Sequence, residues 1–250
     1  MSWAPSPPPS RGDIVLYRVV RAIAVGVSRL YLPGRVLGRD NLPREGAFIL
    51  APVHRSYVDW LIVARVTTRR MRYIAKAEIW KSKIVGRMLE ALGVFPVNRS
   101  GADREALERC GAVLVGGEPL VMFPEGTRRS GRDVVDLREG VAYLALRAGV
   151  PVVPVGIGGS EQSMPRGSVV PRPRRVDVVV GKPIWPPPRG VDPAGATAAA
   201  AGDGTEPVGE AVGEKRHVRV SRRATREFSD QVGAGIQEAF DEARRSAKVT

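Results

Sequence analysis

A histidine and an aspartate five positions apart are the residues of this sequence best suited to general acid–base chemistry. The apolar run F-I-L-A leads directly into P-V-H-R-S-Y-V-D-W, which predicts that His54 lies in a loop at the carboxyl end of a strand and that Asp59 lies in the first turn of a helix. Ligands bind at this end of the strands in open α/β sheets. A loop that brings the Asp59 carboxylate onto one imidazole nitrogen leaves the other free to take a proton from an incoming hydroxyl.

Ser56 precedes Asp59 by three positions, a spacing with capping-box character that predicts a helix beginning at residue 57. The same pattern leaves a structural alternative open, in which His54 caps the helix and Asp59 sits near the helix dipole. No G-x-S-x-G nucleophile motif is present, and Cys110 falls inside a predicted amphipathic helix. Direct attack by an acceptor is therefore favoured over a covalent enzyme intermediate.

Two later strands end in polar residues that reach the same edge of the sheet. The segment V-F-P-V-N-R-S-G places Asn98 and Arg99 after one strand, and F-P-E-G-T-R-R-S-G places a second polar loop after another. A phosphate needs hydrogen-bond donors and positive charge, which Arg99, Arg128 and the backbone amides of Gly126 and Thr127 are able to supply. Glu125 is able to hold a guanidinium in place or to accept from a substrate hydroxyl.

Pro154 lies in V-P-V-V-P-V-G-I, a run that otherwise reads as a central strand. Because proline has no backbone N–H, its position predicts a strand edge, a bulge or a wall around an apolar ligand.

Short apolar runs alternate with helical periodicity in the elements that must position these loops, which predicts a single α/β domain. The predicted strands span residues 47–51, 71–75, 94–97, 120–123, 152–157 and 176–180. The predicted helices between them span residues 57–66, 78–92, 103–115 and 137–148.

The two ends of the chain differ from this central part. We expect a disordered N-terminus over residues 1–12, an amphipathic helix over 13–35, the catalytic domain over 36–185, a flexible low-complexity excursion over 186–222 and a helix over 223–250. In the N-terminal helix Arg18, Arg21 and Arg29 fall within an arc of about 80°. This geometry suits a helix in the membrane interface, although covering the core is an alternative.

The composition favours anionic partners, since 39 Lys and Arg against 26 Asp and Glu give a net charge of +13. A single cysteine excludes an internal disulfide and indicates a reducing compartment. Two histidines and one cysteine are too few to suggest a metal site. One segment, residues 64–88, is strongly basic and suits lipid headgroups. Its cations are Arg65, Arg69, Arg70, Arg72, Lys76, Lys81, Lys83 and Arg87.

Four motifs in order, H-R-S-Y-V-D, G-V-F-P-V-N-R, F-P-E-G-T-R and V-P-V-V-P-V, resemble the glycerolipid acyltransferase family, which acylates glycerol 3-phosphate and 1-acylglycerol 3-phosphate. The resemblance implies a central mixed sheet flanked by helices, with His54 as general base and Asp59 as the residue that orients it. It further implies that Pro154 shapes the acyl site. The residues that it implies for gripping the phosphate-bearing acceptor are Arg99, Glu125, Gly126, Thr127 and Arg128.

The resemblance implies an O-acyltransferase of phospholipid biosynthesis that needs no cofactor and takes its acyl group from acyl-coenzyme A or acyl carrier protein. The sequence most resembles enzymes that acylate the lysophospholipid 1-acylglycerol 3-phosphate to phosphatidic acid. Glycerol 3-phosphate or another lysolipid is an alternative acceptor. We expect peripheral attachment to an anionic membrane surface at the cytoplasmic face, and no nucleic-acid partner. A basic membrane- or nucleic-acid-binding module without catalysis is the alternative of another class.

Overall fold

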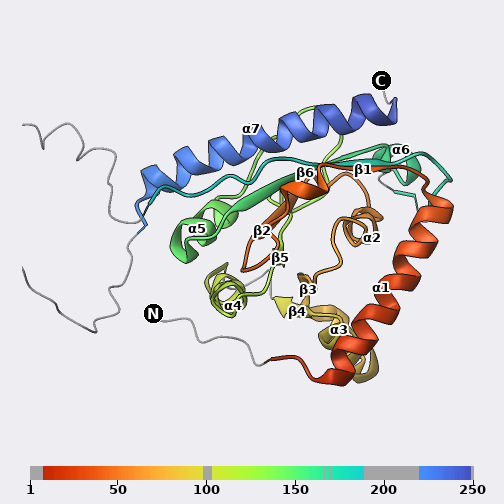
Figure 1. Ribbon diagram of the computed structural model, residues 1–250, viewed down its shortest axis with the longest axis horizontal. Coiled ribbons are helices and arrows are strands. Elements are labelled where there is room, and N and C mark those ends of the chain that lie inside the picture. The colour runs from red at the N-terminus through yellow and green to blue at the C-terminus, as the bar shows by residue number, and fades with distance from the viewer. Residues whose placement is uncertain (1–7, 98–102, 166, 169, 189–219, 249–250) are drawn as a thin grey trace, which may run out of the picture.

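The computed structural model describes residues 8–97, 103–165, 167–168, 170–188 and 220–248. Seven strands form one sheet, and helices lie on both sides of it (Figure 1). The strands are β1 (Val36–Leu37), β2 (Ile49–Pro52), β3 (Arg72–Lys76), β4 (Val94–Val97), β5 (Leu120–Val121), β6 (Val152–Gly158) and β7 (Asp177–Val180). The α-helices are α1 (Arg11–Tyr31), α2 (Asp59–Val63), α3 (Lys83–Ala91), α4 (Asp103–Val115), α5 (Gly140–Ala148), α6 (Ser160–Ser163) and α7 (Arg222–Ala247). Two 3-10 helices, η1 (Arg39–Asn41) and η2 (Ala77–Lys81), complete the order.

The strands follow the order β1-β7-β6-β2-β5-β3-β4 across the sheet. All neighbouring pairs are parallel except β6 and β7, which are antiparallel, so the sheet is mixed. Because β2, β3, β4, β5 and β6 run in the same direction, the loops that follow these five strands emerge at one edge. The predicted α/β architecture with a central mixed sheet is confirmed.

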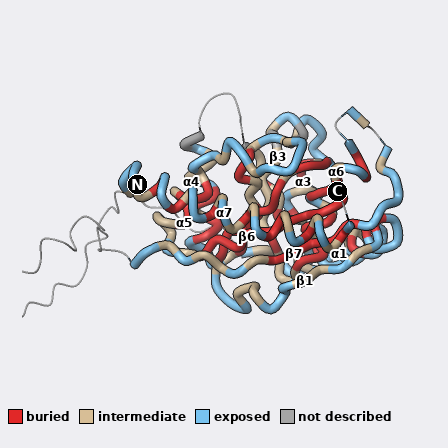
Figure 2. Tube along the Cα trace, turned by 90° about the horizontal axis from the view of Figure 1, so that it is seen from above, coloured by how far each residue is buried: buried red, intermediate tan, exposed pale blue. Residues whose placement is uncertain are grey.

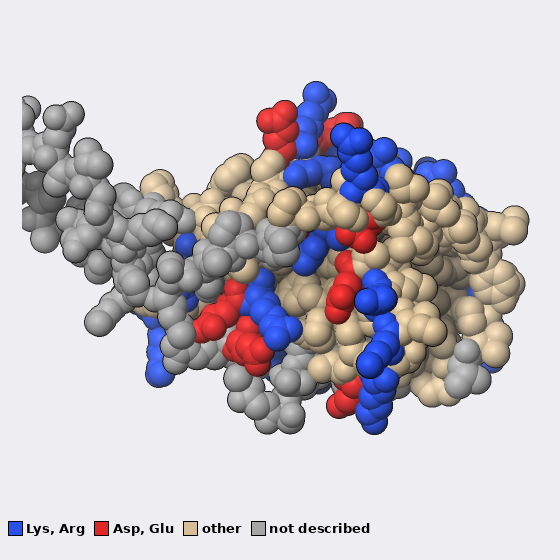
Figure 3. Space-filling view, turned by 90° about the horizontal axis from the view of Figure 1, so that it is seen from below, with Lys and Arg blue, Asp and Glu red and all other residues tan. Residues whose placement is uncertain are grey.

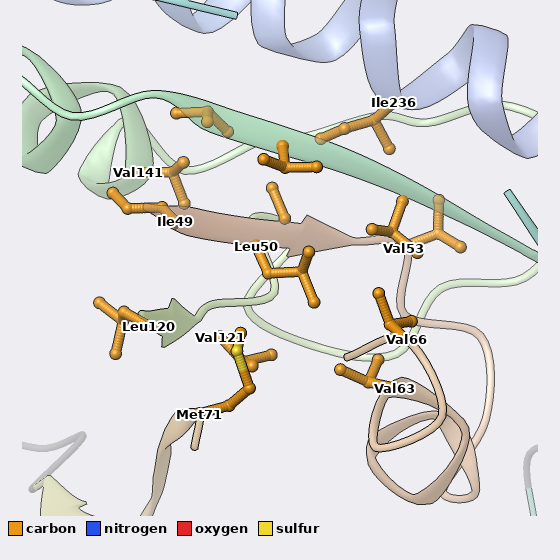
Figure 4. Close-up of a cluster of buried hydrophobic side chains, with 14 of the residues drawn as sticks. Ile49, Leu50, Val53, Val63, Val66, Met71, Leu120, Val121, Val141 and Ile236 are labelled. Carbon is orange, nitrogen blue, oxygen red and sulfur yellow. The ribbon is translucent and has the colours of Figure 1, made fainter. Parts of the chain in front are cut away.

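The centre of the sheet is the centre of the core. All four residues of β2 are buried, as in strands covered on both faces, where apolar residues form a continuous run. Ile49 and Leu50 of this strand lie among side chains from neighbouring strands and helices, including Leu120, Val141 and Ile236 (Figure 4). The buried part of the chain runs through β6 and β7, while the surrounding helices and loops are exposed on their outer sides (Figure 2).

The long helix α7 packs directly on β6. A methyl group in place of a hydrogen on Gly156 would lie 2.0 Å from the Ala239 carbonyl oxygen, and one on Gly158 would lie 2.3 Å from that of Ala243. Glycine at both positions therefore lets the helix backbone approach the strand. Figure 1 shows α7 extended along β6 on one side of the sheet.

Several boundaries differ from the sequence prediction for local reasons. The helix expected over 78–92 is divided into η2 and α3, because Ser82 caps α3 with its side chain on the Val85 amide. The helix expected at 137 begins at Gly140, and the two-residue strand β1 is too short to leave a periodic signal. The strand at 94–97 and the helix at 103–115 have the predicted bounds.

The segments at the two ends are described only in part. Helix α1 begins at Arg11, two residues before the expected position, because the Ser10 and Asp13 side chains form a reciprocal capping box. Helix α7 begins at Arg222, where the Ser221 hydroxyl accepts from the Ala224 amide. Most of the expected disordered N-terminus and of the low-complexity excursion, namely residues 1–7 and 189–219, lies outside the described residues.

Candidate active site

The loop after β2 brings His54 and Asp59 into contact. The imidazole Nδ1 lies 3.1 Å from Asp59 Oδ2, and the same oxygen accepts from the backbone amides of Arg55 and Ser56, each at 2.7 Å. Asp59 is fully buried, whereas the His54 side chain is 22% exposed. Because an ionised carboxylate only accepts hydrogen bonds, this contact places the proton on Nδ1 and leaves the Nε2 lone pair free.

Only one of the two hydrogen bonds of the capping box expected between Ser56 and Asp59 is formed. The Asp59 carboxylate accepts from the Ser56 amide, but the Ser56 hydroxyl donates to the Met164 carbonyl at 3.0 Å instead of capping the helix. The N-cap residue of α2 is Val58, which makes no side-chain cap, and the helix begins at Asp59, two residues later than expected. The hydroxyl thus ties the His54 loop to the end of α6.

Glu125 also holds the His54 loop in place. Its Oε2 accepts from the His54 amide at 2.8 Å, and its Oε1 accepts from Arg55 Nη1 at 2.5 Å. Glu125 is 2% exposed, and both of its oxygens are engaged within the protein. Of the two roles that the sequence left open for Glu125, holding a guanidinium is the one observed, and we assign this residue to positioning His54 instead of to contact with the acceptor.

The remaining residues of the F-P-E-G-T-R loop lie next to His54. The Arg129 amide donates to the His54 carbonyl at 2.8 Å, and the Arg128 guanidinium carbon lies 3.3 Å from the centre of the Tyr57 ring. The Gly126 amide donates to the Phe123 carbonyl, so it is not the free donor that the sequence suggested. Among the described residues the Thr127 amide has no such partner.

Two further expected site residues are Pro154, which lies in the core, and Arg99, which is not described. Pro154 is buried in β6, and its ring packs against Gly181 after β7 and towards Gly235 of α7, at 3.3 Å from the position of a methyl group on the latter. Pro154 is thus part of the core beneath α7, and its part in an acyl site stays a prediction. Arg99 and its neighbour Asn98, like His217 in the low-complexity excursion, lie outside the described residues.

Four of the eight cations in the basic segment 64–88 bind to other groups of the protein. Arg65 donates to the Leu32 and Gly34 carbonyls, and Arg69 donates to two carbonyls of the loop before β2. Arg70 and Arg72 both pair with Glu118. These four arginines join α1, β3 and the neighbouring loops, while the cations of η2 and α3, namely Lys81, Lys83 and Arg87, are exposed.

In the described part of the chain, neither a metal cluster nor a reactive thiol competes for this site. Within these ranges there is no group of three or more His, Cys, Asp and Glu side chains that could hold a metal ion. Cys110 is buried in α4, and burial raises the pKa of its thiol to about 12. The thiolate that nucleophilic catalysis requires is therefore strongly disfavoured at this residue.

A family model described as Acyltransferase matches residues 34–158, which is half of the 250 residues. This chain belongs to the acyltransferase family. The matched range contains the His54–Asp59 contact and the whole F-P-E-G-T-R loop. The resemblance inferred from the four motifs is thereby confirmed.

The acyltransferase is similar in sequence to several known proteins. It is 26% identical over 151 residues to the 1-acyl-sn-glycerol-3-phosphate acyltransferase of Bacillus subtilis (strain 168), a match that covers 60% of this chain and 73% of that protein. It is 31% identical over 163 residues to a 1-acyl-sn-glycerol-3-phosphate acyltransferase from Chlamydomonas reinhardtii, a match that covers 63% of this chain and 48% of that protein. The chain thus spans about half the length of the algal relative.

A solved structure supports the fold of the acyltransferase. The crystal structure of the 1-acyl-sn-glycerophosphate acyltransferase from Thermotoga maritima matches with a TM-score of 0.64 and 22% identity, over 91% of this chain and 81% of that chain. The likeness extends beyond the residues 34–158 of the family match.

The sequence analysis did not identify Arg55, whose side chain holds the loops of the site together. Its guanidinium is fully buried, donates to Glu125 and to the Asp133 carbonyl, and lies 4.9 Å from the centre of the Phe240 ring of α7. It therefore connects the His54 loop, the F-P-E-G-T-R loop and α7 of the acyltransferase. Its place beside His54 in the first motif was the available signal, but burial of an arginine cannot be read from the sequence.

Proposed function

We propose that this acyltransferase moves a fatty acyl group from acyl-coenzyme A or acyl carrier protein to the free hydroxyl of 1-acylglycerol 3-phosphate, giving phosphatidic acid. The contact between His54 Nδ1 and Asp59 Oδ2 carries the proposal, because it orients the other imidazole nitrogen towards a ligand, beside a loop that carries arginines and whose Thr127 amide has no partner among the described residues. The acceptor follows the names of the relatives, which are 1-acyl-sn-glycerol-3-phosphate acyltransferases.

In the proposed reaction His54 Nε2 takes the proton of the acceptor hydroxyl as the hydroxyl oxygen attacks the thioester carbonyl. The new C–O bond forms and the C–S bond breaks, and the departing thiolate receives the proton from the imidazolium. Asp59 stabilises the positive charge that His54 carries between these two transfers. Glu125 and Arg55 keep the loop in place, and the Thr127 amide is a donor for the oxyanion or the phosphate.

Substitution of the two residues in contact tests this mechanism. We expect His54→Ala and Asp59→Asn to lower the rate of acyl transfer by about 10²–10⁴-fold while the far-UV circular dichroism stays unchanged. Asp230→Asn, which removes an exposed carboxylate from α7, is the matched control and should keep the wild-type rate. Near wild-type transfer by purified His54→Ala would reject the mechanism.

The substrates are tested in the same assay with purified wild-type protein. Acyl-coenzyme A and acyl carrier protein thioesters are each offered with 1-acylglycerol 3-phosphate, glycerol 3-phosphate and other lysolipids, and the products are identified by mass spectrometry. We expect phosphatidic acid to form fastest. Preference for glycerol 3-phosphate would keep the chemistry and change the acceptor, whereas salt-sensitive DNA binding without any transfer would favour a non-catalytic basic module.

We further propose that α1 lies on an anionic membrane surface. No helix in the described part of the chain is long and apolar enough to cross a bilayer. The outward face of α1 is nevertheless apolar, and its helix neighbour α3 adds exposed Ile84 and Met88 beside Lys83 and Arg87. The exposed apolar residues of α1 are Val15, Leu16, Val19, Ile23, Val27 and Leu30.

An exposed apolar stripe next to cations is typical of a helix in the membrane interface. The apolar side chains pack among acyl chains, and the cations pair with anionic headgroups. Figure 3 shows the molecule from below, where the right-hand end, at which α1 lies in Figure 1, presents mostly uncharged side chains. Attachment at the cytoplasmic face stays a prediction of the sequence.

Liposome cosedimentation tests this surface. Ile23 is 62% exposed and Val19 is 50% exposed, so Val19→Glu/Ile23→Glu should fold normally and lose most binding to vesicles that contain anionic lipid. Val115→Glu, at the exposed end of α4, is the control for adding a charge to an apolar surface residue. Binding by the wild type that ignores anionic lipid and salt, or binding unaffected by the double substitution, would reject the proposal.

A further inference from the structure

A second arginine, which the motifs do not include, lies against the F-P-E-G-T-R loop. Arg138 is just before α5, and its amide donates to the Pro124 carbonyl at 2.9 Å, which fixes its backbone beside the loop. Gly126 has a φ of +64°, in the region that favours glycine. A methyl group on Gly126 would lie 2.5 Å from Arg138 Nε and 3.2 Å from Arg138 Cζ. The absence of a side chain at Gly126 thus makes room for this guanidinium.

Arg138 differs from Arg55 and Arg129 in having no side-chain partner among the described residues. Arg55 pairs with Glu125, and Arg129 pairs with Asp136 at 3.0 Å. The Arg138 guanidinium makes no hydrogen bond or ion pair with any residue that the structure describes, and the side chain is exposed. Its charge is therefore available to a ligand that reaches the Gly126 turn.

Arg128, in the same turn, also has an unsatisfied donor. One face of its guanidinium is held on the Tyr57 ring, and its Nη1 is buried without a hydrogen-bond partner among the described residues. A phosphate monoester carries close to two negative charges at neutral pH and accepts hydrogen bonds on three oxygens. Two guanidinium groups at one glycine turn match that charge better than one.

We propose that Arg138 binds the phosphate of the acceptor together with Arg128, so that it determines the preference for phosphorylated over unphosphorylated acceptors. This inference rests on the proposed acyl transfer and adds a residue that selects the acceptor. Arg138 has no role in the proton transfer at His54, so its loss affects recognition of the acceptor and leaves the reaction of the bound complex largely intact.

Steady-state kinetics of Arg138→Met test the inference, with 1-acylglycerol 3-phosphate and monoacylglycerol as acceptors that differ only in the phosphate. We expect the KM for the phosphorylated acceptor to rise about tenfold or more, since a charge-assisted hydrogen bond is lost. The KM for the acyl thioester and the rate with monoacylglycerol should stay within about twofold of the wild type. Arg138→Lys should recover part of the loss, because it restores the charge without the planar guanidinium.

Arg132→Met is the matched control, since Arg132 is an exposed arginine of the same loop whose side chain makes no hydrogen bond or ion pair with the described residues of the site. It should leave the KM for the phosphorylated acceptor unchanged, and equal effects of the two substitutions would overturn the inference in favour of a general charge effect. An unchanged KM in Arg138→Met, with active wild type, would overturn the inference alone. If the wild type transfers no acyl group to any acceptor, the proposed function fails and this inference fails with it.

Discussion

The buried ion pair between Arg55 and Glu125 makes a quantitative prediction about the support of the site. The two side chains are 0% and 1% exposed, and Arg55 Nη1 lies 2.5 Å from Glu125 Oε1. Arg55→Met leaves the Glu125 carboxylate buried with one oxygen unpaired. Removal of one partner from a buried pair lowers the free energy of unfolding by about 3–5 kcal/mol.

A second substitution separates the unpaired charge from the loss of packing. In Arg55→Met/Glu125→Gln the buried charge is gone, and the side-chain amide oxygen introduced by the second substitution can still accept from the His54 amide. The remaining loss is the hydrogen bond from Arg55 to the Asp133 carbonyl and the contact with the Phe240 ring, together about 1–2 kcal/mol. The double variant should therefore be about 2–3 kcal/mol more stable than Arg55→Met.

Thermal unfolding followed by circular dichroism measures both differences. For a chain of this length each kcal/mol changes the melting temperature by about 2–4 °C, so Arg55→Met should melt about 6–20 °C below the wild type. The double variant should recover more than half of that difference. Melting of Arg55→Met within about 2 °C of the wild type, or a double variant no more stable than the single one, would refute the argument that the buried charge dominates.

Two further predictions concern α7 and acid stability. Gly156→Ala should lower the melting temperature strongly, because the new methyl would meet the Ala239 carbonyl oxygen of α7, whereas Gly26→Ala, with no atom within 4 Å, should leave it unchanged or slightly higher. Burial raises the pKa of Asp177, but hydrogen bonds from Arg175, Ser246 and the Arg35 amide outweigh it, so the pKa lies below its usual value. The stabilisation is therefore present above about pH 4 and is lost as the pH falls further, so the difference in melting temperature between wild type and Asp177→Asn should shrink as the pH is lowered below about 4. A constant difference between them over this range would contradict the assignment.

The fold could be predicted from the sequence wherever a local pattern is strong. The helix at 103–115 and the strand at 94–97 have their predicted bounds, since their periodicity and their flanking residues act within a few positions along the chain. The division of the helix expected over 78–92 was missed, because the Ser82 cap competes with an apolar pattern that continues through it. The strand β1 was also missed, because its two residues are held by pairing with β7, far away in the sequence.

The sequence by itself determined that His54 and Asp59 lie within reach of each other, because they are close along the chain and the strand that precedes them directs their loop to one edge of the sheet. Only the tertiary structure decided what their neighbours do. Glu125 faces Arg55 and the His54 amide, Pro154 packs beneath α7, and Arg138 lies on Gly126. These contacts join residues that are distant in sequence. Burial decides whether a charged side chain supports the site or faces a ligand, and burial depends on the packing of the whole chain.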